Sequence, residues 1–501
     1  MNSYMGVDIG TSGCKAVVFD KAGRQVALAY REYDLISLQP GQAELDCDEV
    51  LEKCFEVMAE AAGSLEPQSV RGLGISCQGE AFAPIDSGGG VLSNAMVSSD
   101  IRAEQYTQKW TRQFGPKKLY QITGHTAHPM FSLFKLLWLR DHHPAIWSQA
   151  VKFFCFEDML QSRLGLDPAI GWSLAARTML FDVRAQKWSK EILEAVGLRC
   201  DQLARPLPAG AVVGRIEAAI AEGLSLAPGA VVVAGGHDQP CGALGAGATR
   251  PGVAMYATGT VECITPAFEK AVFAENLQVN NLCTYHHAAP GLYATVAFNL
   301  TGGNILKWFR DEFGALEVAE AERTGVNVYQ LLLEVAGDKP SNLLVLPYFT
   351  ATGTPYFDPR ASGAILGLRL TTTRGQIIRG LLEGVAMEMR LNLEILSAAG
   401  CDVNELRAIG GGAKSDRWTQ LKADVLGRPI TVLNITEAAC LGVAMLARAA
   451  DTGELVLDLA ARWNKPVSQK QPDPKAAEHY RNRFEFYKQL YPALKDLSHV
   501  L

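Results

Sequence analysis

The sequence predicts an α/β protein whose two large domains enclose a central cleft. Its 501 residues exceed the length that a single hydrophobic core usually supports. Two segments, 4–20 and 253–264, each have the pattern of a strand, a bend of glycine and small hydroxyl residues, and a second strand. Because this pattern occurs twice, far apart in the chain, we expect a duplicated fold in which both bends face one ligand across the cleft.

Composition and charge exclude several classes of protein. A content of 48% hydrophobic and 20% charged residues is typical of a soluble globular protein. The net charge of −6 predicts no basic face, which argues against nucleic acid as a partner. The first residues lack the pattern of a signal peptide, and no apolar run is long enough to span a bilayer. We therefore expect a cytoplasmic protein with no membrane partner and with reduced thiols at its 11 scattered cysteines.

The bend of the first hairpin has the composition of a phosphate-binding loop. Gly10 and Gly13 allow the backbone to turn and to approach a ligand closely. The N–H groups of Thr11, Ser12 and Gly13 can then surround phosphate oxygens. The alternative is an ordinary hairpin, because glycine, serine, threonine and aspartate are common turn residues. The repetition of the pattern in 253–264 favours the phosphate site.

Charged residues flank this first bend. Asp8 precedes it, and a carboxylate beside a phosphate cradle is repelled unless a cation lies between them, which predicts Mg²⁺. Lys15 follows the bend and can neutralise further phosphate charge. In the second hairpin the small hydroxyl pattern is formed by Thr258, Gly259 and Thr260. We expect these residues to bind the same ligand from the opposite side.

A helix and a strand lead to the next polar residues. The helix is expected over 46–62, where apolar residues recur at helical spacing. The strand 70–76 then places Gln78 and Glu80 just beyond its carboxyl end, where open α/β sheets bind ligands. Both are candidates for hydrogen bonds to substrate hydroxyls, and solvated loop residues are an equal alternative. Asp100 is a further candidate, which a helix-capping role explains equally well.

Residues 130–142, MFSLFKLLWLRDH, show by periodicity alone only an amphipathic helix. Their residue order, however, resembles the first signature of the FGGY carbohydrate kinases. Further segments that resemble this family, over nearly the whole chain, are DIGTSG at 8–13, ARTMLFD at 176–182, AGGHDQPCGALGAG at 234–247, ATGT at 257–260 and the glycine-rich segment 409–430. The resemblance implies two ribonuclease H-like domains, as in the actin, Hsp70 and sugar kinase superfamily. It also implies a kinase that uses ATP and Mg²⁺ to phosphorylate a small sugar or polyol.

Under this resemblance, Asp238 is the candidate catalytic base. It follows the apolar strand 230–234, and a kinase that acts on a hydroxyl needs a carboxylate to accept the proton. A helix cap is the alternative role of Asp238, and the resemblance favours the base. Gln239 would bind a neighbouring hydroxyl. Asp8 and Asp238 are the expected ligands of Mg²⁺.

The C-terminal half carries the expected nucleotide site. We place the domain boundary near 247–252, where GATRPG ends a helix, so that residues 1–248 bind the sugar and supply the base while 249–501 bind the nucleotide. Gly302 opens a helix and either admits the nucleotide or allows contact between helices. The strand 406–409 ends at four small residues whose flat surface suits an adenine ring. The expected contacts there are Gly411, Gly412 and Ala413.

Departures from the family pattern leave the substrate open. Gly79 and Met130 replace an arginine and a tyrosine of glycerol kinases. Glu80 and Ser98 replace a histidine and a tryptophan of xylulokinases. We expect a neutral substrate, because two acids in the pocket would repel an anion, and we predict a pentulose such as xylulose. A linear polyol resembling erythritol or glycerol is one alternative. Another alternative is a non-catalytic sugar sensor on the same fold, which the presence of a base disfavours. The sequence also leaves open whether the protein forms a homodimer.

Overall fold

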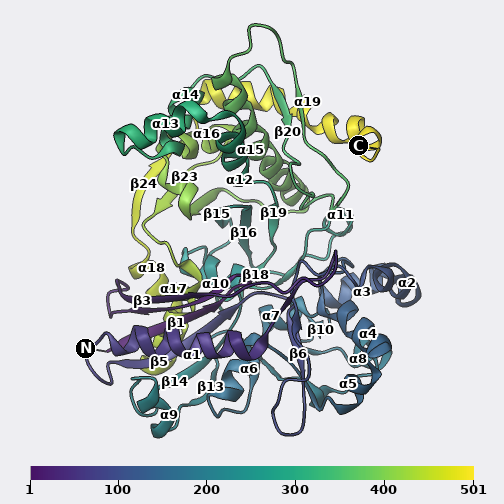
Figure 1. The fold of residues 1–501 in the computed structure, drawn as a ribbon, viewed down its shortest axis with the longest axis vertical. Coiled ribbons are helices and arrows are strands. Elements are labelled where there is room, and N and C mark those ends of the chain that lie inside the picture. The colour runs from purple at the N-terminus through teal and green to yellow at the C-terminus, as the bar shows by residue number, and fades with distance from the viewer. Residues whose placement is uncertain (1, 501) are drawn as a thin grey trace.

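A computed structural model describes residues 2–500, which form two central β-sheets with helices packed around them (Figure 1). The first sheet has six strands in the order β13 (Val212–Arg215), β14 (Val231–His237), β5 (Val70–Cys77), β1 (Ser3–Ile9), β2 (Gly13–Phe19) and β3 (Gln25–Glu32). The second sheet has eight strands. Seven follow the order β17 (Tyr285–His286), β18 (Tyr293–Ala294), β16 (Glu262–Phe268), β15 (Val253–Thr258), β22 (Glu405–Ile409), β23 (Ile430–Leu433) and β24 (Pro466–Lys470). The eighth, β19 (Ala297–Asn299), also pairs with β16. This arrangement confirms the predicted α/β class.

Both predicted hairpins are present, one in each sheet. β1 and β2 are antiparallel around the bend at 10–12, and β15 and β16 are antiparallel around 259–261. A parallel strand, β5 in one sheet and β22 in the other, pairs with the first strand of each hairpin. The two sheets therefore repeat the same local order, as a duplicated fold predicts.

Helices cover the sheets and carry the residues that later form the site. The predicted packing helix is α1 (Cys47–Gly63), and the Asp46 carboxylate caps it by accepting hydrogen bonds from two backbone N–H groups. Other helices used below are α4 (Ser132–His142), α7 (Trp172–Arg177), α10 (Asp238–Gly245), α12 (Asn304–Phe313), α14 (Val328–Ala336), α16 (Asp416–Leu426) and α17 (Ala438–Thr452). No helix within residues 2–500 is both long and apolar enough to cross a lipid bilayer.

α10 and α17 cross at the junction between the two sheets (Figure 1). α17 packs on α10 and also on β1, β5 and β14 of the first sheet. Glycine allows this close approach, since a Cβ atom on Gly245 would lie 1.8 Å from the carbonyl oxygen of Ala438. A Cβ atom on Gly442 would lie 2.1 Å from the carbonyl oxygen of Cys241. The crossing therefore leaves no room for a side chain at either glycine.

The hydrophobic core extends across the predicted domain boundary. α17 belongs to the second half of the chain, yet its buried Cys440 and Val443 pack with Tyr4 and Val17 of the first sheet. Residues between 283 and 296 likewise contribute to the core of the first half. The division at residue 248 stays a prediction, because the two halves share this packing.

We expect Gly442→Ala to lower the free energy of unfolding by about 1–3 kcal/mol, because the added methyl group overlaps the backbone of α10. Chemical denaturation measures this change. Gly223→Ala is the matched control, since Gly223 ends the helix α9 (Ala218–Gly223) and a Cβ atom there meets nothing within 4 Å. An equal loss of stability in both variants would contradict the importance of the crossing.

Candidate active site

The carboxyl end of β14 places Asp238 at the junction between the sheets. β14 ends at His237, and α10 begins at Asp238, whose side chain stays 35% exposed beside a cavity. Nδ1 of His237 lies 2.9 Å from the hydroxyl of Tyr285, and this contact orients the His237 ring. Burial, together with the negative charges of Asp8 and Glu80, raises the pKa of Asp238 to about 7. A carboxyl group with this pKa can act as a general base near neutral pH.

A cavity of about 180 Å³ opens beside Asp238. The residues that we expected at the substrate and that line this cavity are Gln78, Glu80, Asp238 and Gln239. Its other polar lining residues include Thr11, Ser98, His125, Thr126, Arg177, His237 and Asn281. So many hydrogen-bonding groups in one small cavity suit a ligand with several hydroxyl groups.

Glu80 is held by a buried ion pair that was not predicted. Nε and Nη2 of Arg177 both contact Oε1 of Glu80, and the Ser98 hydroxyl donates to Oε2 at 2.6 Å. The guanidinium of Arg177 also lies 4.8 Å from the centre of the Phe131 ring. The negative charge of Glu80 is therefore compensated within the protein. The available signal was a lone arginine in the otherwise uncharged run ARTMLF at 176–181.

Asp100 is not where we expected it. It is fully buried and is not among the residues that line the cavity. Nη2 of Arg102 donates to its carboxylate at 2.6 Å, and the N–H group of Ala43 donates at 2.8 Å. These internal partners satisfy the carboxylate, and Ser98, two residues earlier, lines the cavity instead.

Asp8 and Lys15 face each other at the first hairpin. The Ser76 hydroxyl donates to Oδ1 of Asp8 at 2.9 Å, and Oδ2 lies 3.7 Å from Nζ of Lys15. Burial raises the pKa of Asp8, and the charge of Lys15 opposes this rise. Nζ of Lys15 also lies 2.7 Å from Oε2 of Glu437, which immediately precedes α17. Lys15 was expected to neutralise phosphate charge, but in the structure it binds acids from both halves of the chain.

The three residues expected at the phosphates in the first hairpin have different surroundings. Thr11 lines the cavity beside Asp238, and its hydroxyl donates to Oε1 of Gln78 at 3.1 Å. Ser12 is exposed. Gly13 is buried against β3, where a Cβ atom would lie 2.7 Å from the carbonyl oxygen of Arg31. Packing therefore explains the glycine at 13, while the open surroundings of Ser12 keep it a candidate for phosphate contact.

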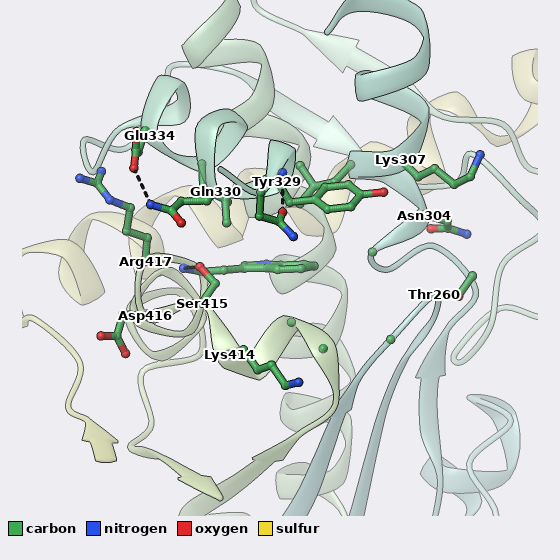
Figure 2. A pocket seen from close by; sticks show the side chains of 18 residues that line it. Thr260, Asn304, Lys307, Tyr329, Gln330, Glu334, Lys414, Ser415, Asp416 and Arg417 are labelled. Atoms are coloured by element: carbon green, nitrogen blue, oxygen red, sulfur yellow. Dashed lines mark hydrogen bonds between the residues drawn. The ribbon is translucent and has the colours of Figure 1, made fainter. Parts of the chain in front are cut away.

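A larger pocket of about 840 Å³ lies beside the second hairpin (Figure 2). Tyr329 and Gln330 of α14 lie on one side of it, opposite Lys414 and Ser415 (Figure 2). The residues that we expected at the nucleotide and that line this pocket are Gly259, Thr260, Gly411 and Gly412. Lining residues that were not predicted include Gly303, Asn304, Lys307, Tyr329, Lys414 and Trp418. Aromatic rings and cationic side chains next to two glycine turns suit an aromatic ligand with phosphate groups.

Three residues expected at the nucleotide lie behind the pocket wall. Thr258 is buried, and its hydroxyl oxygen accepts a hydrogen bond from Lys422 at 2.7 Å. A Cβ atom on Gly302 would lie 2.7 Å from the backbone of the second hairpin, so this glycine serves contact between elements, and Gly303 lines the pocket in its place. Ala413 is also buried, and it packs among apolar residues of the second sheet.

Two carboxylates offer oxygen ligands for Mg²⁺. Asp8 near the end of β1 and Asp238 just after β14 lie at the same edge of the first sheet, because both strands pair in parallel with β5. Across residues 2–500, no three His, Cys, Asp or Glu side chains gather as a metal cage. Mg²⁺ commonly binds through one or two carboxylates, while substrate phosphates and water complete its shell. The residues present therefore fit Mg²⁺ that binds together with a nucleotide.

Comparison with known proteins agrees with this geometry. The N-terminal domain model of the FGGY family of carbohydrate kinases matches residues 3–245, and the C-terminal domain model matches 254–450. Xylulose kinase of Bacillus subtilis (strain 168) is 26% identical over 505 residues, which cover 100% of this chain and 99% of the relative. Glycerol kinase of Methylibium petroleiphilum is 31% identical over 484 residues, which cover 92% and 94%.

A solved structure shows the same fold throughout. The crystal structure of xylulose kinase from Rhodospirillum rubrum matches with a TM-score of 0.90 at 26% identity, over 99% of this chain and 100% of that chain. Since the family models match both halves, the chain belongs to the FGGY family of carbohydrate kinases.

Proposed function

We propose that this sugar or polyol kinase transfers the γ-phosphoryl group of ATP to a hydroxyl group of a neutral pentulose such as xylulose. The observation that carries the proposal is the position of Asp238, which lines the acceptor cavity at the end of β14, at the same edge of the first sheet as Asp8 of the first hairpin. A carboxylate in this position can accept the proton of an acceptor hydroxyl during phosphoryl transfer.

Different residues of the chain accept the proton and stabilise the phosphate charge. Asp238 accepts the hydroxyl proton while the hydroxyl oxygen bonds to the γ-phosphorus and the bond to the bridging oxygen of ADP breaks. Backbone N–H groups at Ser12 and Thr260 are the candidates to stabilise charge on the phosphates, since the N–H group of Gly259 already donates to the carbonyl oxygen of Val261 at 3.0 Å. Mg²⁺, held by Asp8 and Asp238, would supply further neutralisation of phosphate charge.

Charge in the acceptor cavity supports a neutral acceptor. Glu80 is already compensated by Arg177, so that pair leaves little net charge for an anion to meet. Asp238 lies beside His237, and burial holds the pKa of this histidine well below its usual range, which keeps it neutral. An anionic acceptor would therefore approach the carboxylate of Asp238 without a compensating charge on this histidine.

The surroundings of Gly79 argue against recognition of glycerol. A Cβ atom on Gly79 would lie 3.2 Å from Nε of Arg177 and 3.2 Å from Nε2 of His237. These side chains occupy the volume into which an arginine at this position would extend. A different set of contacts must therefore hold the acceptor, which favours a longer polyhydroxy chain. A linear polyol of four or five carbons is the alternative to a pentulose.

Free thiols support a reducing compartment. All 11 cysteines are free, and all but Cys200 are buried. Disulfides mark oxidising compartments, whereas thiols persist in the cytoplasm, where ATP is also present. We place the protein there.

We expect Asp238→Asn to lower kcat by about 10²-fold or more, because an amide of the same shape cannot accept the hydroxyl proton. A coupled assay of ADP release measures kcat, and calorimetry without acceptor and without Mg²⁺ measures the affinity for free ATP, which should be unchanged. Wild-type turnover would refute the assignment of the base. A collapse of ATP affinity would show that Asp238 serves mainly the nucleotide.

Asp8→Asn should act on the metal and phosphate side of the reaction. The variant loses an anionic oxygen, so the Mg²⁺ concentration for half-maximal turnover should rise and kcat should fall. Titration of Mg²⁺ at saturating ATP measures the first effect. Acceptor affinity, measured by calorimetry without nucleotide, is the control and should not change. If acceptor affinity fell instead, Asp8 would belong to the acceptor side.

Glu80→Gln tests the acceptor cavity. The variant leaves the charge of Arg177 unbalanced, so KM for the pentulose should rise about tenfold to a hundredfold, and an aldonate should become a relatively better acceptor. Kinetics over pentuloses, pentitols, glycerol and an aldonate measure both effects. Ser98→Ala is the comparison variant: Ser98 also lines the cavity, but its loss removes one hydrogen bond to Glu80 and keeps the charge pair, so this variant should not favour the aldonate. Equal losses for all acceptors, or a preference for glycerol, would contradict the assignment.

A further inference from the structure

A buried lysine lies beneath the turn of the second hairpin. Lys422 belongs to α16, and only 4% of its side chain is exposed. Its ammonium group lies between two aromatic rings, 4.3 Å from the ring centre of Trp418 and 4.7 Å from that of Tyr256. A lysine buried this deeply is costly unless charged and polar partners compensate it.

Those partners are the two residues that flank the turn. Nζ of Lys422 lies 2.5 Å from Oε1 of Glu262 and donates to the Thr258 hydroxyl oxygen at 2.7 Å. Thr258 is the last residue of β15, Glu262 is the first of β16, and the two pair across the turn. Glu262 is fully buried, and the hydroxyl of Tyr256 donates to its other oxygen. One ammonium group therefore holds both ends of the turn 258–262.

The same lysine connects this turn to the wall of the large pocket. Trp418 lines the pocket and lies one helical turn before Lys422 on α16. The methyl group of Thr258 supports the neighbouring glycine turn, since a Cβ atom on Gly412 would lie 2.2 Å from it and 2.9 Å from the Trp418 ring. With its hydroxyl bound to Lys422, Thr258 directs its methyl group beneath Gly412.

We propose that Lys422 is a positioning residue for the nucleotide. It holds the turn 258–262, which would face the phosphates, at one place relative to Trp418 and Gly412, which would face the adenine ring. This inference rests on the proposed function, in which ATP binds the large pocket. It assigns to Lys422 an effect on ATP affinity, exerted through Thr258 and the turn. It assigns no effect on the acceptor cavity, which lies beside β14.

The test separates positioning from simple charge compensation. Lys422→Met keeps the length of the side chain but leaves Glu262 buried without its cation. Lys422→Met/Glu262→Gln removes both charges, so its thermal midpoint should recover toward that of the wild type. Isothermal titration calorimetry with MgATP, in the absence of any acceptor, should show about tenfold weaker binding for both variants, because a hydrogen bond from a charged group is lost in both.

Two further variants sharpen the test. Thr258→Val keeps the shape of the side chain and removes the hydroxyl group that Lys422 binds, so it should weaken MgATP binding alone but add nothing to Lys422→Met. Gln420→Met is the matched control on α16: its amide binds Asp424 and the carbonyl oxygen of Gln471, and it is not among the pocket residues. It should lower the thermal midpoint without changing MgATP affinity.

Three results would overturn the inference. If the double variant bound MgATP as tightly as the wild type, Lys422 would serve only to compensate Glu262. If Gln420→Met weakened binding as much as Lys422→Met, the effect would be general loosening of α16. In either case the proposed function would stand, as long as the wild-type protein bound MgATP. A wild-type protein that did not bind MgATP would overturn the proposed function and this inference together.

Discussion

The close crossing of α10 and α17 brings chemical groups from both halves of the chain into one site. α10 begins at Asp238, and α17 is preceded by Glu437, whose carboxylate binds Lys15 of the first hairpin. Because Gly245 and Gly442 let the two backbones touch, Glu437 at the start of α17 reaches Lys15 of the first hairpin. Shared packing of this kind also explains why the core continues across the expected domain boundary.

Three buried acids at or behind the walls of the two cavities are neutralised by basic residues of the same chain. The pairs are Glu80 with Arg177, Asp100 with Arg102, and Glu262 with Lys422. A buried charge that loses its partner costs several kcal/mol, so each acid can be buried only because the fold supplies its cation. Asp238 is different: it keeps contact with the cavity, and burial with neighbouring acids raises its pKa. The proposed role of Asp238 as a general base requires that its carboxylate stay accessible in this way.

Several residues that line the two cavities were predictable because their signals are local. The hairpins follow from alternation and glycine spacing, and Gln78 and Glu80 follow from their place after a buried strand. Local signals did not reveal the distant partners that these side chains contact in the structure. Lys15 reads as a phosphate-binding residue and is bound to Glu437, 422 positions away. Thr258 belongs to the glycine pattern and is turned toward Lys422.

The amino-acid sequence was enough to predict the α/β class, the duplicated hairpins, the family resemblance and the position of Asp238 at the end of a strand. These features depend on periodicity and residue order, which can be recognised from residues that lie close together in the sequence. Which polar side chains line a cavity and which contact one another became visible only in the folded chain. Arg177 meets Glu80 across 97 positions, and Lys422 meets Thr258 across 164. Such pairings leave no local pattern, because the free energy of burying a charge depends on what the fold places beside it.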